Sequence, residues 1–288
     1  MNAILEVEGL TKSYKNSDFY LNNISFSLPR GAIMGFIGEN GAGKTTTISC
    51  ILNTLLKDSG TVKIFGKNID DGSADIRNDI GVVFDASSFS DDLTATQLSS
   101  VMRQIYTKWD NNLFNVYLKK FKLSNKKKVR TFSRGMSMKL GIAVALSHRP
   151  RLLILDEVTS GLDPVARDEI LDIFLDFVQD ENHSVLLSSH ITTDLEKIAD
   201  YITFIHEGKI IFCKKKDELI YKYGIMRCKS AQFAEIDRKN IIAYKKQDYQ
   251  TDVLINNKQA MEKKYRDFVI DNVTIEEIIL MFVKGEKQ

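Results

Sequence analysis

The sequence has few cysteines. Its 288 residues include only Cys50, Cys213 and Cys228, an odd number at wide spacing. This pattern matches neither a disulfide framework nor a metal-binding or redox motif, and it suits a reducing compartment such as the cytosol. With 43% hydrophobic residues, the chain can instead bury a substantial core.

Long hydrophobic runs and an excess of either charge are also absent. No apolar stretch approaches the ~20 residues that a membrane-spanning helix needs, and the segment Met1 to Glu6 does not have the pattern of a signal peptide. A role at a membrane would therefore need a partner. Forty basic residues against 38 acidic ones give a net charge of +2, so no overall field favours nucleic acid.

One segment carries the pattern G-x-x-x-x-G-K-[ST], which begins at Gly38 and ends at Thr45. The apolar run 32–37 before it predicts a buried parallel strand, and the apolar spacing in 45–56 after it predicts a helix. A strand, a glycine loop and a helix in this order point backbone N–H groups and a helix N-terminus at a phosphate chain.

The residue types in this loop suit a nucleotide. Glycines remove Cβ atoms where the chain must bend around phosphate oxygens. Lys44 would neutralise the β- and γ-phosphates, and the hydroxyl of Thr45 would bind Mg²⁺, which prefers oxygen ligands. The predicted ATP-binding residues of this segment are Gly38, Glu39, Asn40, Gly41, Ala42, Gly43, Lys44, Thr45 and Thr46.

Other polar residues follow predicted strands at the points where these strands end. Asp156 and Glu157 follow the apolar run 152–155, His190 follows a strand around 185–187, and Asp85 follows the strand 79–84. Ligands of doubly wound α/β sheets bind at this edge. Asp156 could therefore hold the magnesium shell, while Glu157 could polarise a water molecule.

Between and after these strands the pattern changes twice. Helical spacing dominates from about 93 to 146, and a helix opened by Asp163 and Pro164 runs to about 178. After about Lys222 the order reads strand 226–229, helix 231–239, strands 241–245 and 252–256, helix 258–265, strand 268–270 and a final helix 274–283. This order suggests a small split-βαβ appendage.

The whole set of motifs resembles the nucleotide-binding subunits of ABC transporters, from Leu5 to about Leu219. The matching positions, in order, are Tyr14, the loop 38–45, the Q-loop position Asp85, the signature 132–136, the Asp156-Glu157 pair, the D-loop 160–163 and His190. The resemblance implies an α/β P-loop NTPase of the ABC type, with an antiparallel β subdomain and a helical subdomain. The expected domains are 1–220, with the helical subdomain at about 88–147, and a small α+β domain at 221–288 that is regulatory or supports a dimer.

The resemblance also implies roles for these residues. Tyr14 would stack on adenine, with a surface tyrosine as the alternative. Lys44, Glu157 and His190 would be the catalytic residues, with Glu157 activating water and His190 holding the γ-phosphate. Thr45, Asp85 and Asp156 would bind Mg²⁺. Two subunits would enclose ATP, with Ser133, Gly135 and Asp163 contributed across the interface of a homodimer or a heterodimer.

Two positions depart from the family pattern. The signature, usually Leu-Ser-Gly-Gly-Gln, reads Phe-Ser-Arg-Gly-Met here, and aspartate replaces glutamine at position 85. Both bear on the rate of hydrolysis and on coupling to a membrane partner.

Three functions follow as hypotheses. The first is an ATPase subunit at the cytoplasmic face of the membrane that drives a separate permease exporting peptides, antibiotics or related molecules, with residues 86–115 receiving the permease. The second is a soluble ABC-type ATPase that acts on nucleic acid or ribosomes. Such proteins usually carry coiled-coil insertions or tandem nucleotide domains, which are not visible here. The third is a weakly hydrolysing nucleotide sensor.

Overall fold

The computed structural model describes residues 3–15, 17–72, 74–84 and 89–286. The chain forms two compact units, of which the first ends at Cys213 and the second begins at Lys214. The sequence placed this boundary at 220/221. Helix α8 (Lys216–Lys222) lies in the second unit, because it packs against strand β11 (Tyr223–Cys228) and helix α10 (Lys258–Lys264).

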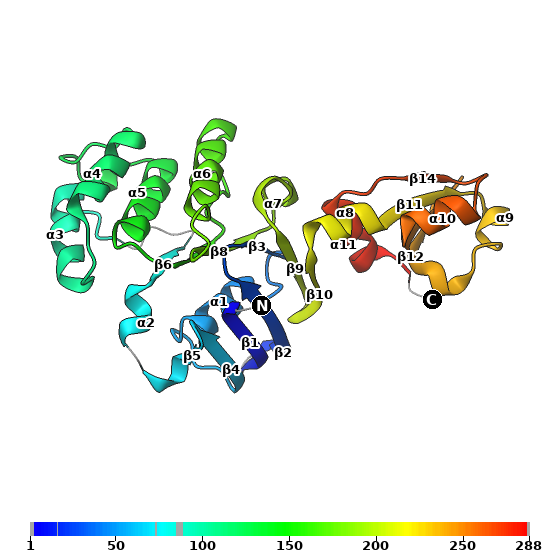
Figure 1. Ribbon diagram of the computed structural model, residues 1–288, viewed down its shortest axis with the longest axis horizontal. Helices are drawn as coiled ribbons and strands as arrows, with labels where there is room; N and C mark the ends of the chain where they lie inside the picture. The colour runs from blue at the N-terminus through cyan, green and yellow to red at the C-terminus, as the bar shows by residue number, and fades with distance from the viewer. Residues whose placement is uncertain (1–2, 16, 73, 85–88, 287–288) are drawn as a thin grey trace. The chain divides into compact units, whose positions relative to one another are not determined.

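A six-stranded sheet forms the centre of the first unit (Figure 1). Its strand order is β10-β9-β3-β8-β7-β6. The bounds are β3 (Ile33–Ile37), β6 (Ile80–Val83), β7 (Leu152–Asp156), β8 (Ser184–Ser189), β9 (Tyr201–His206) and β10 (Lys209–Lys215). Strand β3 pairs in parallel with β8 and β9, and β7 pairs in parallel with β6 and β8. The strands predicted to end at a common edge therefore do so.

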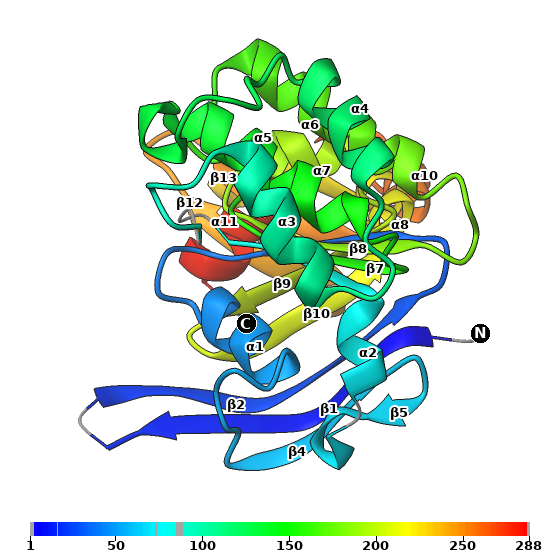
Figure 2. The same ribbon diagram turned by 90° about the vertical axis from the view of Figure 1, so that its left-hand side faces the viewer.

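A second, four-stranded sheet of the first unit has the order β2-β1-β4-β5 and antiparallel pairing. Figure 2 shows its two long strands side by side. The bounds are β1 (Ala3–Tyr14), β2 (Ser17–Pro29), β4 (Ser59–Ile64) and β5 (Lys67–Asn68). This sheet is the antiparallel part that the family resemblance implied.

The helices of the first unit begin where the sequence offers caps. Their bounds are α1 (Lys44–Ile51), α2 (Ala74–Asn78), α3 (Ala95–Ile105), α4 (Asn111–Lys120), α5 (Arg134–Ser147), α6 (Pro164–Phe177) and α7 (Thr192–Ile198). Thr94 caps α3 in a capping box with Gln97, and Asp110 caps α4. Helices α3, α4 and α5 pack against one another, and α5 also packs against β6.

The second unit has the predicted split-βαβ order. The strands β12 (Ile241–Lys246), β13 (Thr251–Asn256), β11 and β14 (Val269–Asp271) lie in that order in an antiparallel sheet, with β13 inserted between β11 and β12. Helix α11 (Ile275–Lys284) begins with a capping box at Thr274, as its Thr-x-x-Glu sequence indicates.

One helix of this unit was predicted too long. Instead of spanning 231–239, helix α9 covers only Ser230–Phe233, and a separate short 3-10 helix covers Arg238–Asn240. The break coincides with two hydrogen bonds of Asp237. Its carboxylate accepts a hydrogen bond from the N–H of Lys239 at 3.3 Å, and its own N–H donates to the hydroxyl of Tyr265 at 3.0 Å. Both bonds compete with a continuous helix.

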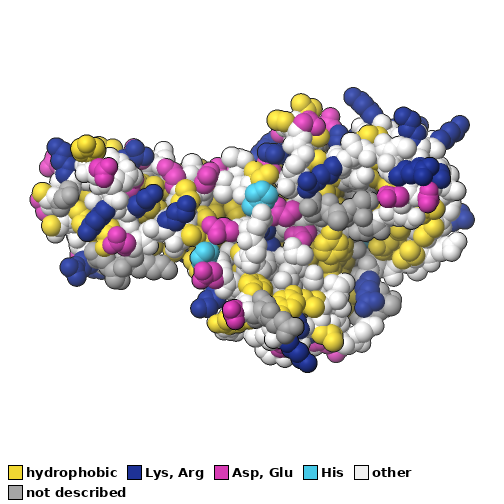
Figure 3. All heavy atoms as spheres, turned by 180° about the vertical axis from the view of Figure 1, so that it is seen from behind, with side chains coloured by type: hydrophobic (Ala, Val, Ile, Leu, Met, Phe, Trp, Pro, Cys, Tyr) yellow, Lys and Arg dark blue, Asp and Glu magenta, His cyan; other side chains and the backbone are white. Residues whose placement is uncertain are grey.

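The surface carries both charges. On the face in Figure 3, Lys and Arg side chains are interspersed with Asp and Glu side chains. This agrees with the small net charge of the sequence. Among the residues that the structure describes, no helix has both the length and the apolar character needed to cross a membrane.

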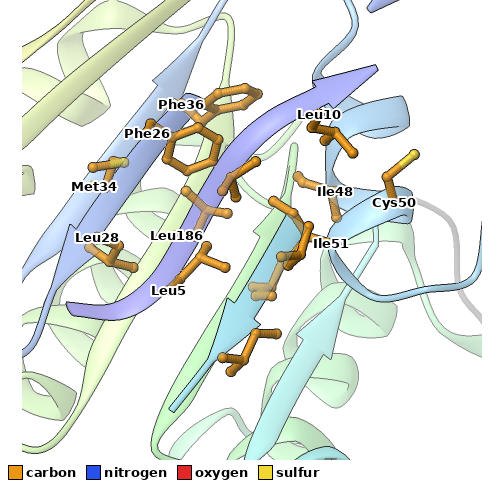
Figure 4. Packing of buried hydrophobic residues seen from close by; sticks show 14 of the residues in the cluster. Leu5, Leu10, Phe26, Leu28, Met34, Phe36, Ile48, Cys50, Ile51 and Leu186 are labelled. Carbon is orange, nitrogen blue, oxygen red and sulfur yellow. The ribbon is translucent and has the colours of Figure 1, made fainter. Parts of the chain in front are cut away.

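The main hydrophobic core brings the two sheets of the first unit together with α1. Figure 4 shows Leu5 and Leu10 of β1, Phe26 of β2 and Ile48 of α1 among its members. The rings of Phe26 and Phe36, one from each sheet, lie 5.3 Å apart. Because Phe36 is buried in β3, which leads directly into the glycine loop, this core anchors the start of the loop.

Candidate functional site

Lys44 folds back over the glycine loop. The loop joins β3 to α1, and Lys44 is the first residue of α1. Its Nζ donates to the carbonyl oxygen of Gly38 at 2.7 Å and to that of Glu39 at 3.2 Å. The side chain is only 5% exposed, so the positive charge of Lys44 is held against the backbone of the loop.

The N-terminus of α1 is suited to an anion. Gly43 is its N-cap residue and makes no side-chain hydrogen bond to the first turn. The N–H groups at a helix start have no partner inside the helix, and they attract negative charge. Glu39, Asn40, Gly41 and Ala42 line a hollow of about 460 Å³ beside the loop.

Asp156 connects the glycine loop to the central strands. Its Oδ2 accepts a hydrogen bond from the hydroxyl of Thr45 at 2.7 Å, and its Oδ1 accepts one from the hydroxyl of Ser188. The carboxylate is buried, and Asp156 lies opposite Ser188 in the pairing of β7 with β8. The hydroxyl and the carboxylate are the hard oxygen donors that Mg²⁺ prefers, so this pair fits that ion.

Glu157 lies at the centre of the site. Its backbone has a φ of +54°, and its N–H donates to the backbone oxygen of Ser188 at 3.1 Å. Its Oε1 lies 3.1 Å from Nζ of Lys44, and its Oε2 lies 2.7 Å from Nδ1 of His190. One carboxylate therefore contacts both the loop lysine and the histidine that follows β8.

The contact between His190 and Glu157 indicates which imidazole nitrogen carries hydrogen. A carboxylate oxygen accepts hydrogen bonds, so Nδ1 of His190 carries the hydrogen in this arrangement. His190 is 42% exposed, whereas Glu157 is 15% exposed. The imidazole thus lies at the rim of the site, above a carboxylate that is largely shielded from solvent.

Tyr14 lies beside the first turn of α1. Its hydroxyl is 3.4 Å from Oγ1 of Thr46, and its ring is 39% exposed at the end of β1. The neighbouring Ser13 is fixed by Asp58, which accepts hydrogen bonds from both its hydroxyl and its N–H. The hydrogen bonds from Ser13 lower the pKa of Asp58 to about 2. The exposed ring is available for stacking.

The predicted residues of the signature and the D-loop lie at other helix starts. Ser133 caps α5 by accepting from the N–H of Met136 at 3.2 Å. Asp163 caps α6 by accepting from the N–H groups of Val165 and Ala166, of which the bond from Ala166 lowers its pKa most. Among the described residues, no hydrogen bond or ion pair joins Ser133, Gly135 or Asp163 to the loop 38–45.

Position 85 cannot be placed in this geometry. Asp85, predicted as a magnesium ligand and as the Q-loop position, lies outside the described residues. Conversely, sequence reasoning missed the role of Ser188. The signal was present, because Ser188 stands two residues before His190 at the end of a strand, but the partner strand had to be known first.

A hydrophobic groove lies on the side of the helices α3 and α5. It consists of two hollows of about 560 and 650 Å³ that share Val82, Phe84 and Tyr106. The ring of Tyr106 stacks on the buried His148 with the ring centres 3.9 Å apart. Ile105 on the rim is 58% exposed. Exposed apolar areas of this kind are found where proteins bind other proteins, membranes or ligands.

Comparisons with known proteins agree on one family. The family model described as "ABC transporter" matches residues 21–160. The bacitracin transport ATP-binding protein BcrA of Bacillus licheniformis is 37% identical over 213 residues, which are 73% of this chain and 69% of that protein. The lantibiotic transport ATP-binding protein SrtF of Streptococcus pyogenes is 36% identical over 216 residues, which are 74% of this chain and 92% of that protein.

Solved structures give the same result. An ATP-binding subunit of an ABC transporter superposes with a TM-score of 0.66 at 27% identity, covering 75% of this chain and 91% of the other. The ATP-binding cassette MJ0796, a dimer in a post-hydrolysis state with ADP and phosphate, has a TM-score of 0.66 at 22% identity, covering 73% and 98%. The second likeness concerns the fold alone.

Proposed function

This chain belongs to the ATP-binding subunits of ABC transporters, and we propose that its ATP hydrolysis powers a separate membrane permease that exports peptides, antibiotics or related molecules. The cargo class is supported by relatives named for bacitracin and lantibiotic transport. The alternatives, a soluble ATPase acting on nucleic acid or ribosomes and a nucleotide sensor, have no comparable support.

The observation that carries the proposal is the convergence of Lys44, Glu157 and His190. The carboxylate of Glu157 lies 3.1 Å from the lysine and 2.7 Å from the histidine. ATP phosphates would take the place of Glu157 as the partner of Lys44. The released carboxylate could then orient and deprotonate a water molecule, while His190 would hold the γ-phosphate.

Magnesium is the second ligand that we propose. Thr45 and Asp156 would hold it, because they already place a hydroxyl and a carboxylate oxygen 2.7 Å apart. Bound Mg²⁺ would neutralise charge on the β- and γ-phosphates. Ser188 orients the other carboxylate oxygen of Asp156. Asp85 remains a proposed third ligand on the basis of its sequence position.

Two subunits, identical or related, are proposed to complete each ATP site. Ser133, Gly135 and Asp163 lie at the first turns of α5 and α6. A serine hydroxyl and backbone N–H groups at a helix start bind anions. In a dimer, Ser133 and Gly135 of one subunit would contact the γ-phosphate held by the loop of the other, and Asp163 would communicate across the interface. Tyr14 would stack on the adenine of the ATP bound to its own loop.

The permease is proposed to dock on the helical part of the first unit, which we assign to about 88–147. The apolar groove and the exposed Ile105 lie inside or beside the predicted docking region 86–115. Docking would place the chain at the cytoplasmic face of the membrane. The second unit is proposed to regulate the subunit or to support the dimer.

Co-purification tests this function. The chain, tagged and isolated from mild-detergent extracts of its native cells, should bring down a polytopic membrane protein, and the complex should turn over ATP only when Mg²⁺ is present. Isolation with ribosomes or nucleic acid instead would favour the alternative. ATP binding without turnover in the complete complex would favour the sensor.

A further inference from the structure

The outer side of the glycine loop is fixed by a turn far away in the sequence. The turn joins β9 to β10 and consists of Glu207 and Gly208, whose φ values are +45° and +69°. The N–H of Gly208 donates to the carbonyl oxygen of Ala42 at 3.0 Å. The carbonyl oxygen of Gly208 accepts from the N–H of Asn22 in β2 at 2.8 Å. One residue therefore connects the loop to the second sheet.

The contacts around this turn leave no room for larger residues. A Cβ atom on Gly208 would lie 1.9 Å from the carbonyl oxygen of Tyr20. A Cβ atom on Gly38 would lie 2.5 Å from the carbonyl oxygen of Ile205, and one on Gly43 would lie 2.6 Å from the side chain of Leu21. The loop is thus in close contact with β2 and with the end of β9.

The hydrogen bond from Gly208 to the carbonyl oxygen of Ala42 also fixes the direction of the next N–H group. In a trans peptide the carbonyl oxygen and the following N–H point in opposite directions, and the described residues contain no cis peptide. Because the carbonyl of Ala42 points at Gly208, the N–H of Gly43 points away from the turn, into the loop. This N–H is one of the groups that a phosphate would contact.

We propose that Gly208 is a positioning residue for the phosphate-binding loop. Together with Ile205 it holds the Ala42–Gly43 peptide so that the N–H of Gly43 faces the phosphates. The inference rests on the proposed binding of nucleotide by this loop. The positioning role applies to ADP and ATP equally, because the bond between Gly208 and Ala42 does not involve Glu157 or His190, the residues proposed to act on the γ-phosphate.

The test compares two glycines with nearly the same positive φ. Gly208 has a φ of +69° and Gly72 has a φ of +71°, but a Cβ atom on Gly72 would meet nothing within 4 Å. Gly208→Ala and Gly72→Ala therefore introduce the same backbone strain, and only the first displaces the turn. Gly208→Ala should raise the Kd for ADP at least about tenfold, because the N–H of Gly43 would no longer be aimed at a charged phosphate oxygen and a hydrogen bond to a charged group accounts for about this factor in affinity.

Steady-state kinetics distinguish a positioning role of Gly208 from a general loss of protein stability. Gly208→Ala should raise KM for ATP by about the factor by which it raises the Kd for ADP, with kcat nearly unchanged, because the loss is uniform binding. The midpoint temperature of thermal unfolding without nucleotide should fall further in Gly208→Ala than in Gly72→Ala, because only the first variant meets the carbonyl oxygen of Tyr20. The increase in this temperature on adding ADP should be reduced only in Gly208→Ala.

A second pair covers the case in which Gly208→Ala does not fold. Ile205 and Ile202 are both fully buried in β9, but only Ile205 contacts the Cβ positions of Gly38 and Gly43. Both valine variants lose one buried methylene and should lower folding stability to a similar extent, but only Ile205→Val should weaken ADP binding, by about twofold or more.

Two results would overturn the proposal or its basis, and they are distinguishable. ADP binding by Gly208→Ala equal to that of Gly72→Ala, or equal binding by the two valine variants, would refute the positioning role alone. Failure of the unaltered protein to bind ADP or ATP would instead refute the proposed function.

Discussion

Replacing Glu157 by glutamine should separate ATP binding from hydrolysis. The substitution keeps the size of the side chain and removes its charge and basicity. A general base contributes about 10²–10⁴-fold to the rate, which corresponds to about 3–5 kcal/mol of the barrier. We therefore expect kcat to fall by about this factor at saturating MgATP.

The contacts of Glu157 predict that ATP binding does not weaken. Its Oε1 lies 3.1 Å from Nζ of Lys44, so ATP must displace this ion pair before the lysine can bind phosphate. Glutamine has no charge to displace. The Kd for ATP should therefore stay the same or decrease, and any increase should remain below about tenfold, or about 1.4 kcal/mol.

The assay is steady-state ATP turnover together with the Kd for ATP in the same preparation. Glu169→Gln is the matched control, since Glu169 accepts a hydrogen bond from Lys139 at 2.7 Å on the outside of α6, and its turnover should be unchanged. Turnover of Glu157→Gln at the level of the unaltered protein would remove Glu157 as the base. Loss of ATP binding would show that the carboxylate supports the loop.

The remaining predictions concern the loop and its neighbours. Lys44→Ala should abolish binding at micromolar ATP because the charge at the mouth of the loop is lost; unchanged binding in equilibrium titrations would contradict the assignment of the loop. Ser188→Ala should raise the Mg²⁺ concentration needed for half-maximal turnover, because Asp156 loses a hydrogen bond that orients it, and a change in protein stability alone would argue against this role. Asp58 has its pKa lowered from 3.8 to about 2 by Ser13, so it stabilises the folded state above pH 4, and this contribution is lost as the pH falls toward 2. The stability difference between the unaltered protein and Asp58→Asn, from urea unfolding, should therefore shrink between pH 5 and pH 2.5, and a constant difference would refute the assignment.

The arrangement of the central strands was predictable from local sequence. Apolar runs ending in Asp156, Glu157 and His190 predicted parallel strands with a common polar edge, and the structure brings these three residues into one site. The rule works because parallel strands in α/β proteins are buried on both faces and end at the same side.

Contacts between distant segments were not predictable in this way. The bond between Ser188 and Asp156 depends on the pairing of β7 with β8, and the contact of Gly208 with Ala42 depends on where β9 lies beside β3. Both involve residue types that are common in loops. The break in the predicted helix 231–239 likewise depends on Tyr265, which is distant in sequence from Asp237.

The groove beside α3 is a third feature that the sequence did not predict. The lining residues of its first hollow come mainly from β6, α3 and α5, and each of these segments alone resembles part of a hydrophobic core. Only the packing of the helices shows that Val82, Phe84 and Tyr106 share a hollow.

Strand β10 gives the glycine loop a connection to the second unit along the chain. It begins directly after Gly208 and continues to Lys215, so it contains the boundary between Cys213 and Lys214. The chain therefore passes from the first unit to the second within a strand of the central sheet. At ~3.3 Å per residue, about 20 Å of extended chain separates Gly208 from the second unit. The turn that holds Ala42 and the first residues of the second unit thus belong to one short stretch of backbone.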